Sequence, residues 1–376
     1  MKGWIDMKRR SDMRGQTNME TNDAPGAGAA CRLGQVMRAV VHTLLVVLAL
    51  AAIARPVAAG GARERGLTRV VIGYQAIPNG ELVAKQLGWH EETLGVPVHW
   101  VQFNSGSELN AAIAAGSVDL GLGGSSTTVV AIAQGVPARV IWIHNIIGEN
   151  EALVVRRGSD IRTVADLRGR TVSAPFGATT HYHLLTALQL AGVEPAELRV
   201  LDMPPTEMLA AWLRGDIDAG FVWEPTLAAM LEADGRVLVS SGELAAQGFL
   251  TGDIGIARTG FLEQHPDIVV QYLRNQMRAV TMIQTEPNRA AAAIAAELSL
   301  DGAEARRQMD SLVFLDAAQQ LSAAYLGRDG APGELAEVFL ETGRFLAEQD
   351  TIQMAPDRAR IEAFLAPEFL QRAAQD

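Results

Sequence analysis

The chain has 376 residues, of which 48% are hydrophobic and 20% are charged, and its formal net charge is −11. This length allows two compact lobes, each with its own hydrophobic core. The acidic balance disfavours nucleic acid or an anionic membrane surface as a partner, because both attract an excess of Lys and Arg. A small anion that is held by neutral hydrogen-bond donors is compatible with it.

The first elements along the chain predict an export signal. Arg38 precedes the apolar run 44–53, LLVVLALAAI, and the small residues of RPVAAGG follow it. A basic residue, a short apolar core and a small-residue cleavage site are the parts of such a signal. The run is too short to cross a bilayer, which needs about 20 residues, although a retained single-helix anchor is the alternative. We expect residues 1–59 to be a leader that is cleaved after Ala59.

Cleavage would also remove Cys31, the only cysteine of the chain. Cys31 precedes the apolar run, so it is not placed as a lipid-attachment cysteine, which would follow that run. A mature protein without cysteine has no disulfide, no thiol nucleophile and no thiolate metal site. Several enzyme classes are excluded for this reason.

From Thr68 onward, strand-like and helix-like segments alternate. TRVVIGY, VPVHWVQF and SVDLGLG read as strands, and each leads into a helical pattern. Such alternation predicts parallel sheets with helices on both faces, with ligands bound beyond the carboxyl ends of the strands. After the strand that begins at Asp253, long helical stretches cover 267–285 and 287–298.

One sequence pattern occurs twice along the chain. AAIAAGSVDLGLG and AAWLRGDIDAGFVW both read as a helix, a glycine, a polar residue, an aspartate near a strand start and then small apolar residues. Two similar α/β lobes that face each other across a cleft would explain the repetition. Coincidence in a chain rich in Ala and Gly is the alternative.

Three strand-to-helix junctions carry hydroxyl and backbone NH donors and lack a basic residue: 173–188 (SAPFGATTHYHLLTAL), 121–127 (GLGGSST) and 104–109 (NSGSEL). A helix start exposes about four unpaired NH groups and the positive end of the helix dipole, and therefore suits an anion. Simple capping by Thr179 or Thr180 is the alternative at the first junction. GLGGSST lacks both the P-loop lysine and the last glycine of a nucleophile elbow.

Two histidines follow the threonines of the first junction. His181 and His183 are two residues apart, so they point to different faces of a helix, and no third residue nearby has metal-ligand spacing. We therefore predict no metal site. His181 is expected to donate a hydrogen bond at the helix start, and His183 to be exposed or packed.

Three carboxylates lie at predicted strand or turn ends: Glu151, Glu224 and Asp253. Each alone reads as a solvated loop charge. Trp223, at the end of an apolar strand beside Glu224, changes this interpretation because a tryptophan face attracts organic cations and nearby carboxylates would pair with an ammonium. Together with the donor-rich junctions, these residues indicate a ligand with an anionic head and a cationic amine.

At these residues the chain resembles the periplasmic taurine-binding proteins of ABC importers, a branch of the alkanesulfonate and nitrate-type binding proteins. The resemblance runs from about residue 70 to about residue 285, and it is weak beyond. It implies a two-lobed type II periplasmic binding-protein fold, with mainly parallel sheets flanked by helices and the C-terminal helices on lobe one. Lobe one would comprise 67–156 plus 250–376, and lobe two 157–249. The motifs on which the resemblance rests are VVIGYQ, NSGSELNAAIAAGSVDLG, GSS, NEALVV, APFGATTHYHLL, AAWLRGDIDAGFVWEP and the Asp253 strand.

The resemblance also implies the ligand-binding residues. Glu151 and Asp253 would face the amine and Trp223 would form a wall, while Glu224 departs from the family pattern and would either add a second amine ligand or point to solvent. The sulfonate would be gripped by Ser125, Ser126, Thr179, Thr180 and His181, and the cleft would be flanked by Tyr74, Gln75, Ser105 and Gly106.

The expected function is that of a monomeric, non-enzymatic periplasmic receptor, without cofactor, that delivers taurine to an inner-membrane ABC permease. One alternative is the same receptor for simple alkanesulfonates, which depends on whether the carboxylates reach the ligand. Another is a pyrimidine-synthesising enzyme of the thiamine pathway, which shares this fold. That enzyme family uses a cysteine-rich segment, and the mature chain would have no cysteine.

The export signal generates a first testable prediction. Protein recovered from a periplasmic extract is expected to begin at Gly60, because cleavage after Ala59 leaves Val57 and Ala59 as the small residues that the peptidase accepts. Intact-mass spectrometry measures this directly. Recovery of the uncleaved chain in the membrane fraction would instead favour a retained anchor.

Overall fold

The computed structural model describes residues 67–375. The predicted leader, with its apolar run 44–53, its cleavage point at Ala59 and Cys31, lies outside these residues. Within the described part, no helix combines the length and the apolar character needed to cross a membrane.

The first sheet is built from the beginning of the described chain and from strands that return to it later. Its strands are β1 (Val70–Tyr74), β2 (Val98–Gln102), β3 (Leu120–Gly124), β4 (Ala138–Ile147), β10 (Gly252–Arg258) and β11 (Leu312–Val313). The six strands lie in the order β11-β4-β10-β3-β1-β2. β1 is parallel to β2 and β3, whereas β10 is antiparallel to β3 and β4.

The second sheet uses the middle of the chain. Its strands are β5 (Glu151–Arg156), β6 (Thr171–Ala174), β7 (Arg199–Asp202), β8 (Ala219–Trp223) and β9 (Gly235–Ser240). The five strands lie in the order β7-β6-β8-β5-β9, with β6 parallel to β7 and β8, and β5 antiparallel to β8 and β9. A separate two-stranded ribbon is formed by β12 (Gly327–Arg328) and β13 (Ala331–Pro332).

Both sheets are therefore mixed, where mainly parallel sheets were predicted. Parallel neighbours need a crossover of a dozen or more residues. Only residues 148–150 separate β5 from β4, and β10 follows the last strand of the second sheet. Neither strand therefore joins its sheet through such a crossover. Strand pairing places β5 in the second sheet, whereas the predicted division counted 151–156 with lobe one. The division of the lobes as moving bodies stays a prediction.

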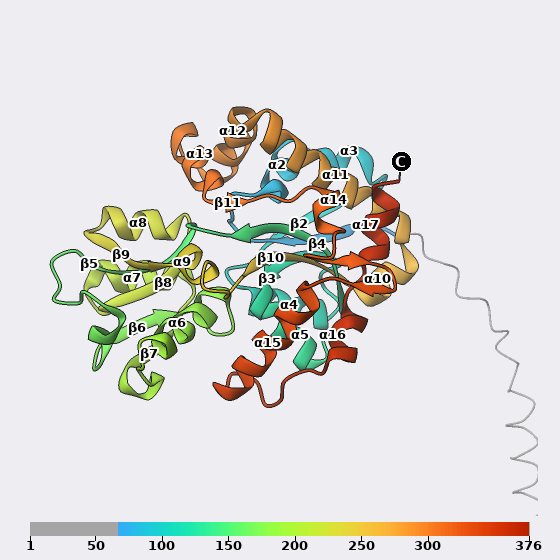
Figure 1. The fold of residues 1–376 in the computed structure, drawn as a ribbon. Coiled ribbons are helices and arrows are strands. Elements are labelled where there is room, and N and C mark those ends of the chain that lie inside the picture. Colours follow the sequence, from blue (N-terminus) through green and yellow to red (C-terminus); the bar gives the residue numbers. More distant parts are fainter. Residues whose placement is uncertain (1–66, 376) are drawn as a thin grey trace, which may run out of the picture. The chain divides into compact units, whose positions relative to one another are not determined.

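Helices cover both sheets (Figure 1). Around the second sheet lie α6 (Thr179–Leu190), α7 (Pro205–Arg214), α8 (Thr226–Glu232) and α9 (Ser241–Ala245), with the 3-10 turns Val164–Leu167 and Pro195–Glu197. Around the first sheet lie α2 (Gly80–Gln86), α3 (Trp89–Thr93), α4 (Gly106–Ala114), α5 (Ser125–Gln134), α10 (Thr259–Gln264), α11 (Pro266–Thr285), α12 (Pro287–Leu298), α13 (Gly302–Asp310), α14 (Ala317–Gln320), α15 (Leu335–Glu348), α16 (Arg358–Phe364) and α17 (Pro367–Ala373).

The C-terminal helices return to the first sheet, as predicted. α15 and α16 pack on α5, and α17 packs on α11 and β4. The second sheet has a separate core on each face, because alternate residues of a strand point to opposite sides. In β5, Leu153 and Val155 join one core, whereas Ala152 and Val154 join the other. Burial on both faces explains why this strand reads as a continuous apolar run.

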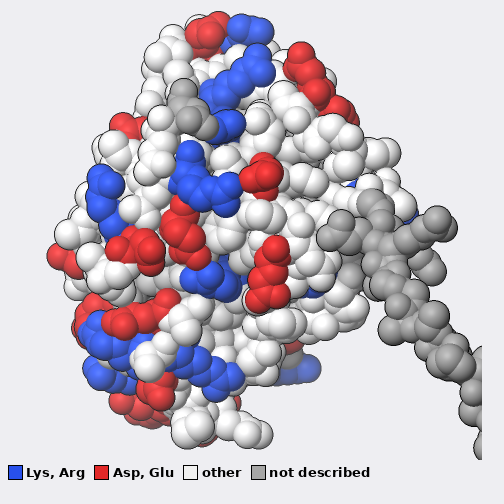
Figure 2. Space-filling model, turned by 90° about the vertical axis from the view of Figure 1, so that its right-hand side faces the viewer, with Lys and Arg blue, Asp and Glu red and all other residues white. Residues whose placement is uncertain are grey.

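Charged side chains of both signs are intermixed on the face drawn in Figure 2, and uncharged surface separates them. This face has no extended area of a single charge. Among the described residues, many charged side chains are paired with a neighbour of opposite sign, such as Arg170 with Asp160 and Arg306 with Asp310.

Candidate functional site

The strand ends of the two sheets meet at one place. Trp223, at the end of β8, is only 9% exposed and belongs to an apolar cluster with Ile77, Leu122, Ala178 and Leu312, which combines residues from both sheets. Trp223 lies directly opposite Glu151 in the β5–β8 pairing. Glu151 therefore stands beside the contact between the sheets.

Gly124 and Thr179 bring the first sheet against the start of α6. A Cβ atom on Gly124 would lie 2.7 Å from Thr179 Cγ2, so only glycine allows this approach. In the β3–β10 ladder, Gly124 lies opposite Asp253. Thr179 in turn donates a hydrogen bond of 2.6 Å from Oγ1 to Glu151 Oε1. The structure thus gathers the predicted residues Glu151, Thr179, Trp223 and Asp253 in one region.

The start of α6 is not capped by a side chain. Its N-cap is Ala178, so Thr179 and Thr180 are the first helical residues and the capping alternative is wrong. Thr180 Oγ1 is buried and has no hydrogen-bond partner among residues 67–375. The first NH groups of a helix have no acceptor within it, and this end carries positive partial charge. The start of α6 can therefore hold an anion.

His181 lies in the same first turn and is oriented by the loop before it. Gly177 N donates to His181 Nδ1 at 3.3 Å, and the imidazole stacks on Phe176 with the ring centres 4.6 Å apart. Burial lowers the pKa of His181 to about 4. The ring is therefore neutral near pH 7 and, since Nδ1 accepts, it carries its proton on Nε2. His181 Nε2 can therefore donate a hydrogen bond, and its role toward a ligand stays a prediction.

The start of α5 is partly engaged in contacts across the two sheets. Ser126 Oγ and Thr127 Oγ1 each donate to the carbonyl oxygen of Gly177 at 3.2 Å. Ser125 Oγ accepts from Gly252 N at 3.4 Å, so its own proton is free to be donated. Of the two predicted serines, Ser125 offers a hydroxyl donor, whereas the Ser126 hydroxyl already has an acceptor.

The start of α4 has mainly a structural role. Ser105 is the N-cap of the helix, where its Oγ accepts from Glu108 N at 3.3 Å. Gly106 packs so tightly on α5 that a Cβ atom there would lie 2.7 Å from Thr127 Cγ2. Capping therefore describes the contacts of Ser105, and Gly106 permits the close approach of two helices.

Gln75 and Tyr74, the other two residues predicted to flank the cleft, lie in different surroundings. Gln75 is buried beside β3, where its Nε2 donates to the Leu122 carbonyl at 3.2 Å. Tyr74 packs against an apolar cluster that includes residues of α2 and α12. Its ring meets the ring of Trp100 edge to face, and its hydroxyl donates to Gln102 Oε1 at 3.3 Å. These contacts do not bring Tyr74 to the other predicted residues.

Glu151 and Asp253 are 3% and 4% exposed, and their hydrogen-bond partners are neutral. Glu151 Oε1 accepts from Thr179 Oγ1, Glu151 Oε2 lies 3.1 Å from Ser241 Oγ, and Asp253 accepts from Asn145 Nδ2 at 2.7 Å. No Lys or Arg of residues 67–375 pairs with either. Burial raises the pKa of Glu151 to about 8, to which Asp253 contributes, and raises the pKa of Asp253 to about 6.

Glu224, which was predicted either to contact the amine or to point to solvent, does not point to solvent. Its side chain is buried, and it accepts from Arg307 Nη2 at 2.9 Å and from Ala228 N at 2.9 Å. Arg307 belongs to α13, which packs with the first sheet, so this ion pair joins the two halves of the fold. An acid that already has an arginine is not available to an ammonium.

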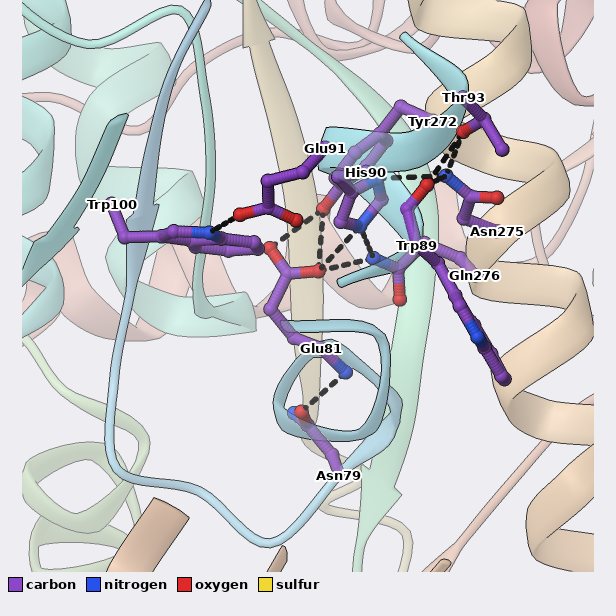
Figure 3. Close-up of polar contacts among 10 residues, drawn as sticks. All are labelled: Asn79, Glu81, Trp89, His90, Glu91, Thr93, Trp100, Tyr272, Asn275 and Gln276. Carbon is purple, nitrogen blue, oxygen red and sulfur yellow. Dashed lines mark hydrogen bonds and ion pairs between the residues drawn. The ribbon is translucent and has the colours of Figure 1, made fainter. Parts of the chain in front are cut away.

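Asn79 and Asn145 were not predicted. Asn145 bonds Asp253, and its Oδ1 accepts from Asn79 Nδ2 at 3.2 Å. Asn79 caps α2 through the backbone NH of Glu81, at the edge of the buried cluster drawn in Figure 3. There the Glu81 carboxylate accepts from Tyr272 and Gln276. Asp253 is therefore held by a hydrogen-bonded chain that runs to α2.

The comparisons with known proteins agree with this fold. The NMT1/THI5 like family matches residues 79–290. The chain belongs to this family. It is 37% identical over 210 residues to the taurine-binding periplasmic protein of Escherichia coli (strain K12), a match that covers 56% of this chain and 65% of that protein.

Solved structures of the family's two-lobed fold are also similar. The alkanesulfonate-binding protein from Xanthomonas axonopodis pv. citri, bound to MOPS, superposes with a TM-score of 0.66 at 22% identity, over 80% of this chain and 98% of that one. The periplasmic aliphatic sulphonate binding protein from Escherichia coli gives a TM-score of 0.62 at 23% identity, over 78% and 92%. They establish the two-lobed α/β fold.

The buried acids predict a pH dependence of stability. Burial raises the pKa values of Glu81 and Glu151 to about 8, so above neutral pH the folded state retains protons that the unfolded state has lost. Stability should therefore fall as the pH rises from 6.5 to 9. Below pH 6.5 four buried histidines have the opposite effect on stability, because their pKa values in the folded state are only about 3 to 4. These are His90, His144, His181 and His183.

Urea unfolding of the ligand-free protein at several pH values measures this. Glu151→Gln is expected to remove roughly half of the alkaline loss, since Glu81 supplies the other part. Glu263→Gln, at an exposed position, is the matched control and should change nothing. An unchanged alkaline slope in Glu151→Gln would mean that Glu151 is already ionised in the folded protein.

Proposed function

We propose that this chain is the substrate-binding protein of an ABC importer, that it captures taurine between two lobes and that it delivers the ligand to an inner-membrane permease. The observation that carries the proposal is the position of Thr179. It is the first residue of a helix start suited to an anion, and it donates to Glu151, one of two buried carboxylates with neutral partners only. An anion site and a cation site are thus adjacent.

Taurine fits this pair of sites because its sulfonate and its ammonium are two carbons apart. A sulfonate stays deprotonated and only accepts hydrogen bonds, so a site of NH and OH donors suits it. The start of α6, with Thr180 Oγ1 and His181 Nε2, would hold this end of the ligand. Phosphate is partly protonated near neutral pH, and a donor-only site would leave its proton without an acceptor.

The ammonium would lie against Glu151 and Asp253, with the face of Trp223 as a wall. Trp223 pairs with Glu151 in the sheet and lies in the cluster between the sheets, so its position supports this role. Of the other predicted ligand-binding residues, Ser125 and Gln75 have contacts that support a place at the cleft. Tyr74, Ser105, Gly106, Ser126 and Glu224 have their structural contacts instead.

The same role for simple alkanesulfonates is the second candidate. The raised pKa of Glu151 favours it, because a protonated acid tolerates an uncharged tail better than a carboxylate does. We infer a binding protein rather than an enzyme, since the relative in sequence that is named above is a binding protein and the only cysteine lies in the predicted leader. A periplasmic location, cleavage of the leader and a monomeric state belong to the same proposal.

Ligand binding can be tested by thermal shift of the mature chain. A ligand present at 100 times its dissociation constant stabilises the folded state by about 2.7 kcal/mol, so millimolar taurine should raise the melting temperature. Sulfate and glycine, which each carry only part of the recognised chemistry, are the controls and should shift it less. The receptor proposal fails if no sulfonate produces a shift.

The cation half of the site is tested by Asp253→Asn. Removal of one member of a buried charge pair costs about 2–5 kcal/mol, or roughly 30- to several-thousand-fold in affinity, so taurine should bind much more weakly. Ethanesulfonate lacks the amine and should bind equally well or better. Titration calorimetry of both ligands on both proteins measures this, with Asp267→Asn as the control at an exposed aspartate. Equal losses for the two ligands would mean that Asp253 only supports the fold.

A further inference from the structure

His183 lies behind Glu151 and is linked to it by one serine. The imidazole is fully buried, with Nδ1 2.7 Å from Ser241 Oγ and Nε2 2.9 Å from the carbonyl oxygen of Phe249. Ser241 Oγ lies 3.1 Å from Glu151 Oε2. The four groups form an unbranched row from a peptide carbonyl to the carboxyl group at the proposed ammonium site.

The carbonyl at one end fixes the direction of the first hydrogen bond in this row, and the protonation state of His183 then sets the other two. A peptide carbonyl only accepts, so His183 Nε2 must carry a proton. If the ring is neutral, Nδ1 is bare and accepts from the hydroxyl of Ser241. The serine has one proton and has then used it, so Glu151 must be a carboxylic acid that donates from Oε2 to Ser241 Oγ.

A second arrangement holds the same number of protons. If Glu151 is ionised, Ser241 donates to its Oε2, and the serine oxygen then accepts from a protonated His183 Nδ1. The row is neutral overall in both arrangements. With both Glu151 and His183 deprotonated, one of the two contacts of Ser241 would face a lone pair, which a buried polar group avoids.

We propose that Glu151, Ser241 and His183 form a proton relay, in which one proton passes from Glu151 to His183 when a ligand ammonium reaches the carboxyl group. The inference rests on the proposed function for the identity of that ligand. Ser241 and His183 are positioning residues, because they act on the ligand through Glu151.

The transfer is balanced within the row. The O–H bond of Glu151 breaks as its proton joins Ser241 Oγ, while the former serine proton leaves Oγ to form the N–H bond at His183 Nδ1. No oxidant, solvent proton or further group is needed. Glu151 becomes a carboxylate that faces the ammonium, and the compensating positive charge lies on the far side of Ser241.

The surroundings favour the uncharged arrangement before the ligand arrives. Burial raises the pKa of Glu151 to about 8 and lowers the pKa of His183 to about 4. The rings of Tyr182 and Phe221 flank His183, at 5.5 and 6.1 Å between centres. The titratable group that acts on Glu151 from the first sheet is Asp253, whose charge also favours the acid form.

An ammonium reverses this preference. A cation near a carboxyl group stabilises its ionised form, and in a buried site the interaction is screened far less than in water. Release of the proton to solvent would require a path out of a closed site, whereas the relay keeps it two hydrogen bonds away. The site would therefore adjust its charge to a zwitterion and stay uncharged for a sulfonate without an amine.

Nitrogen NMR of protein labelled at histidine tests the relay, with the signals of His183 assigned by their loss in His183→Gln. In the ligand-free protein at pH 7, His183 is expected to be neutral with the proton on Nε2. Saturating taurine should protonate Nδ1 as well, while ethanesulfonate should leave it bare. A His183 that stays neutral in the taurine complex overturns the proposal.

Calorimetry of serine variants supplies a second readout. In the native chain the proton is retained, so the heat of taurine binding should not depend on the ionisation enthalpy of the buffer. Ser241→Ala breaks the row, so binding should weaken roughly ten- to a hundredfold and release about one proton to the buffer. Ser241→Thr keeps the hydroxyl and should restore the native pattern. Ser159→Ala, which removes a serine hydroxyl beyond the far end of β5, is the matched control.

The outcomes separate the relay from the function on which it rests. If no amine-bearing sulfonate binds, the proposed function fails, and the ligand-free spectrum decides the relay geometry. A His183 proton on Nδ1 in that spectrum, or a charged ring at pH 7, rejects it. If taurine binds and Ser241→Ala behaves like Ser159→Ala, the function stands and the relay is wrong.

Discussion

The burial of Glu151 and Asp253 without a basic partner is the constraint on which the site depends. A carboxylate removed from water costs several kcal/mol unless it is paired or protonated. The chain supplies only hydroxyl and amide groups to these two acids, from Thr179, Ser241 and Asn145. Without a ligand, protonation is the remaining way to lower this cost, and the raised pKa values express it. A cation that enters the site stabilises the ionised form of these acids instead.

The same region brings the two sheets into contact. Gly124 permits Thr179 to approach the first sheet, and the Gly177 carbonyl accepts two hydroxyl groups from α5. These contacts use donors that a sequence-based interpretation assigns to the ligand. Some hydroxyl groups at the junctions hold the sheets together, and the unused donors at the start of α6 are left for an anion.

The sequence predicted the alternation of strands and helices and the gathering of Glu151, Thr179, Trp223 and Asp253, because strand ends and helix starts have local signals. It did not predict the mixed sheets. The antiparallel direction of β5 and β10 depends on how the chain passes from one sheet to the other. Asn145 was missed for a related reason, and of His183 only its packing was predicted. Their roles come from partners distant in sequence, Ser241 and Asp253, and no local pattern marks such a pair.

Two other buried acids each receive an arginine, which Glu151 and Asp253 lack. Glu224 at the end of β8 receives Arg307, and Asp119 at the start of β3 receives Arg258 at 2.6 Å. Glu81 has no Lys or Arg in the contacts drawn in Figure 3, yet Tyr272 and Gln276 bond its carboxyl group within a buried cluster. Glu151 and Asp253 come from different sheets and lie in one contact region with the donor-rich start of α6. Neutral surroundings there suit a ligand that carries both a positive and a negative charge.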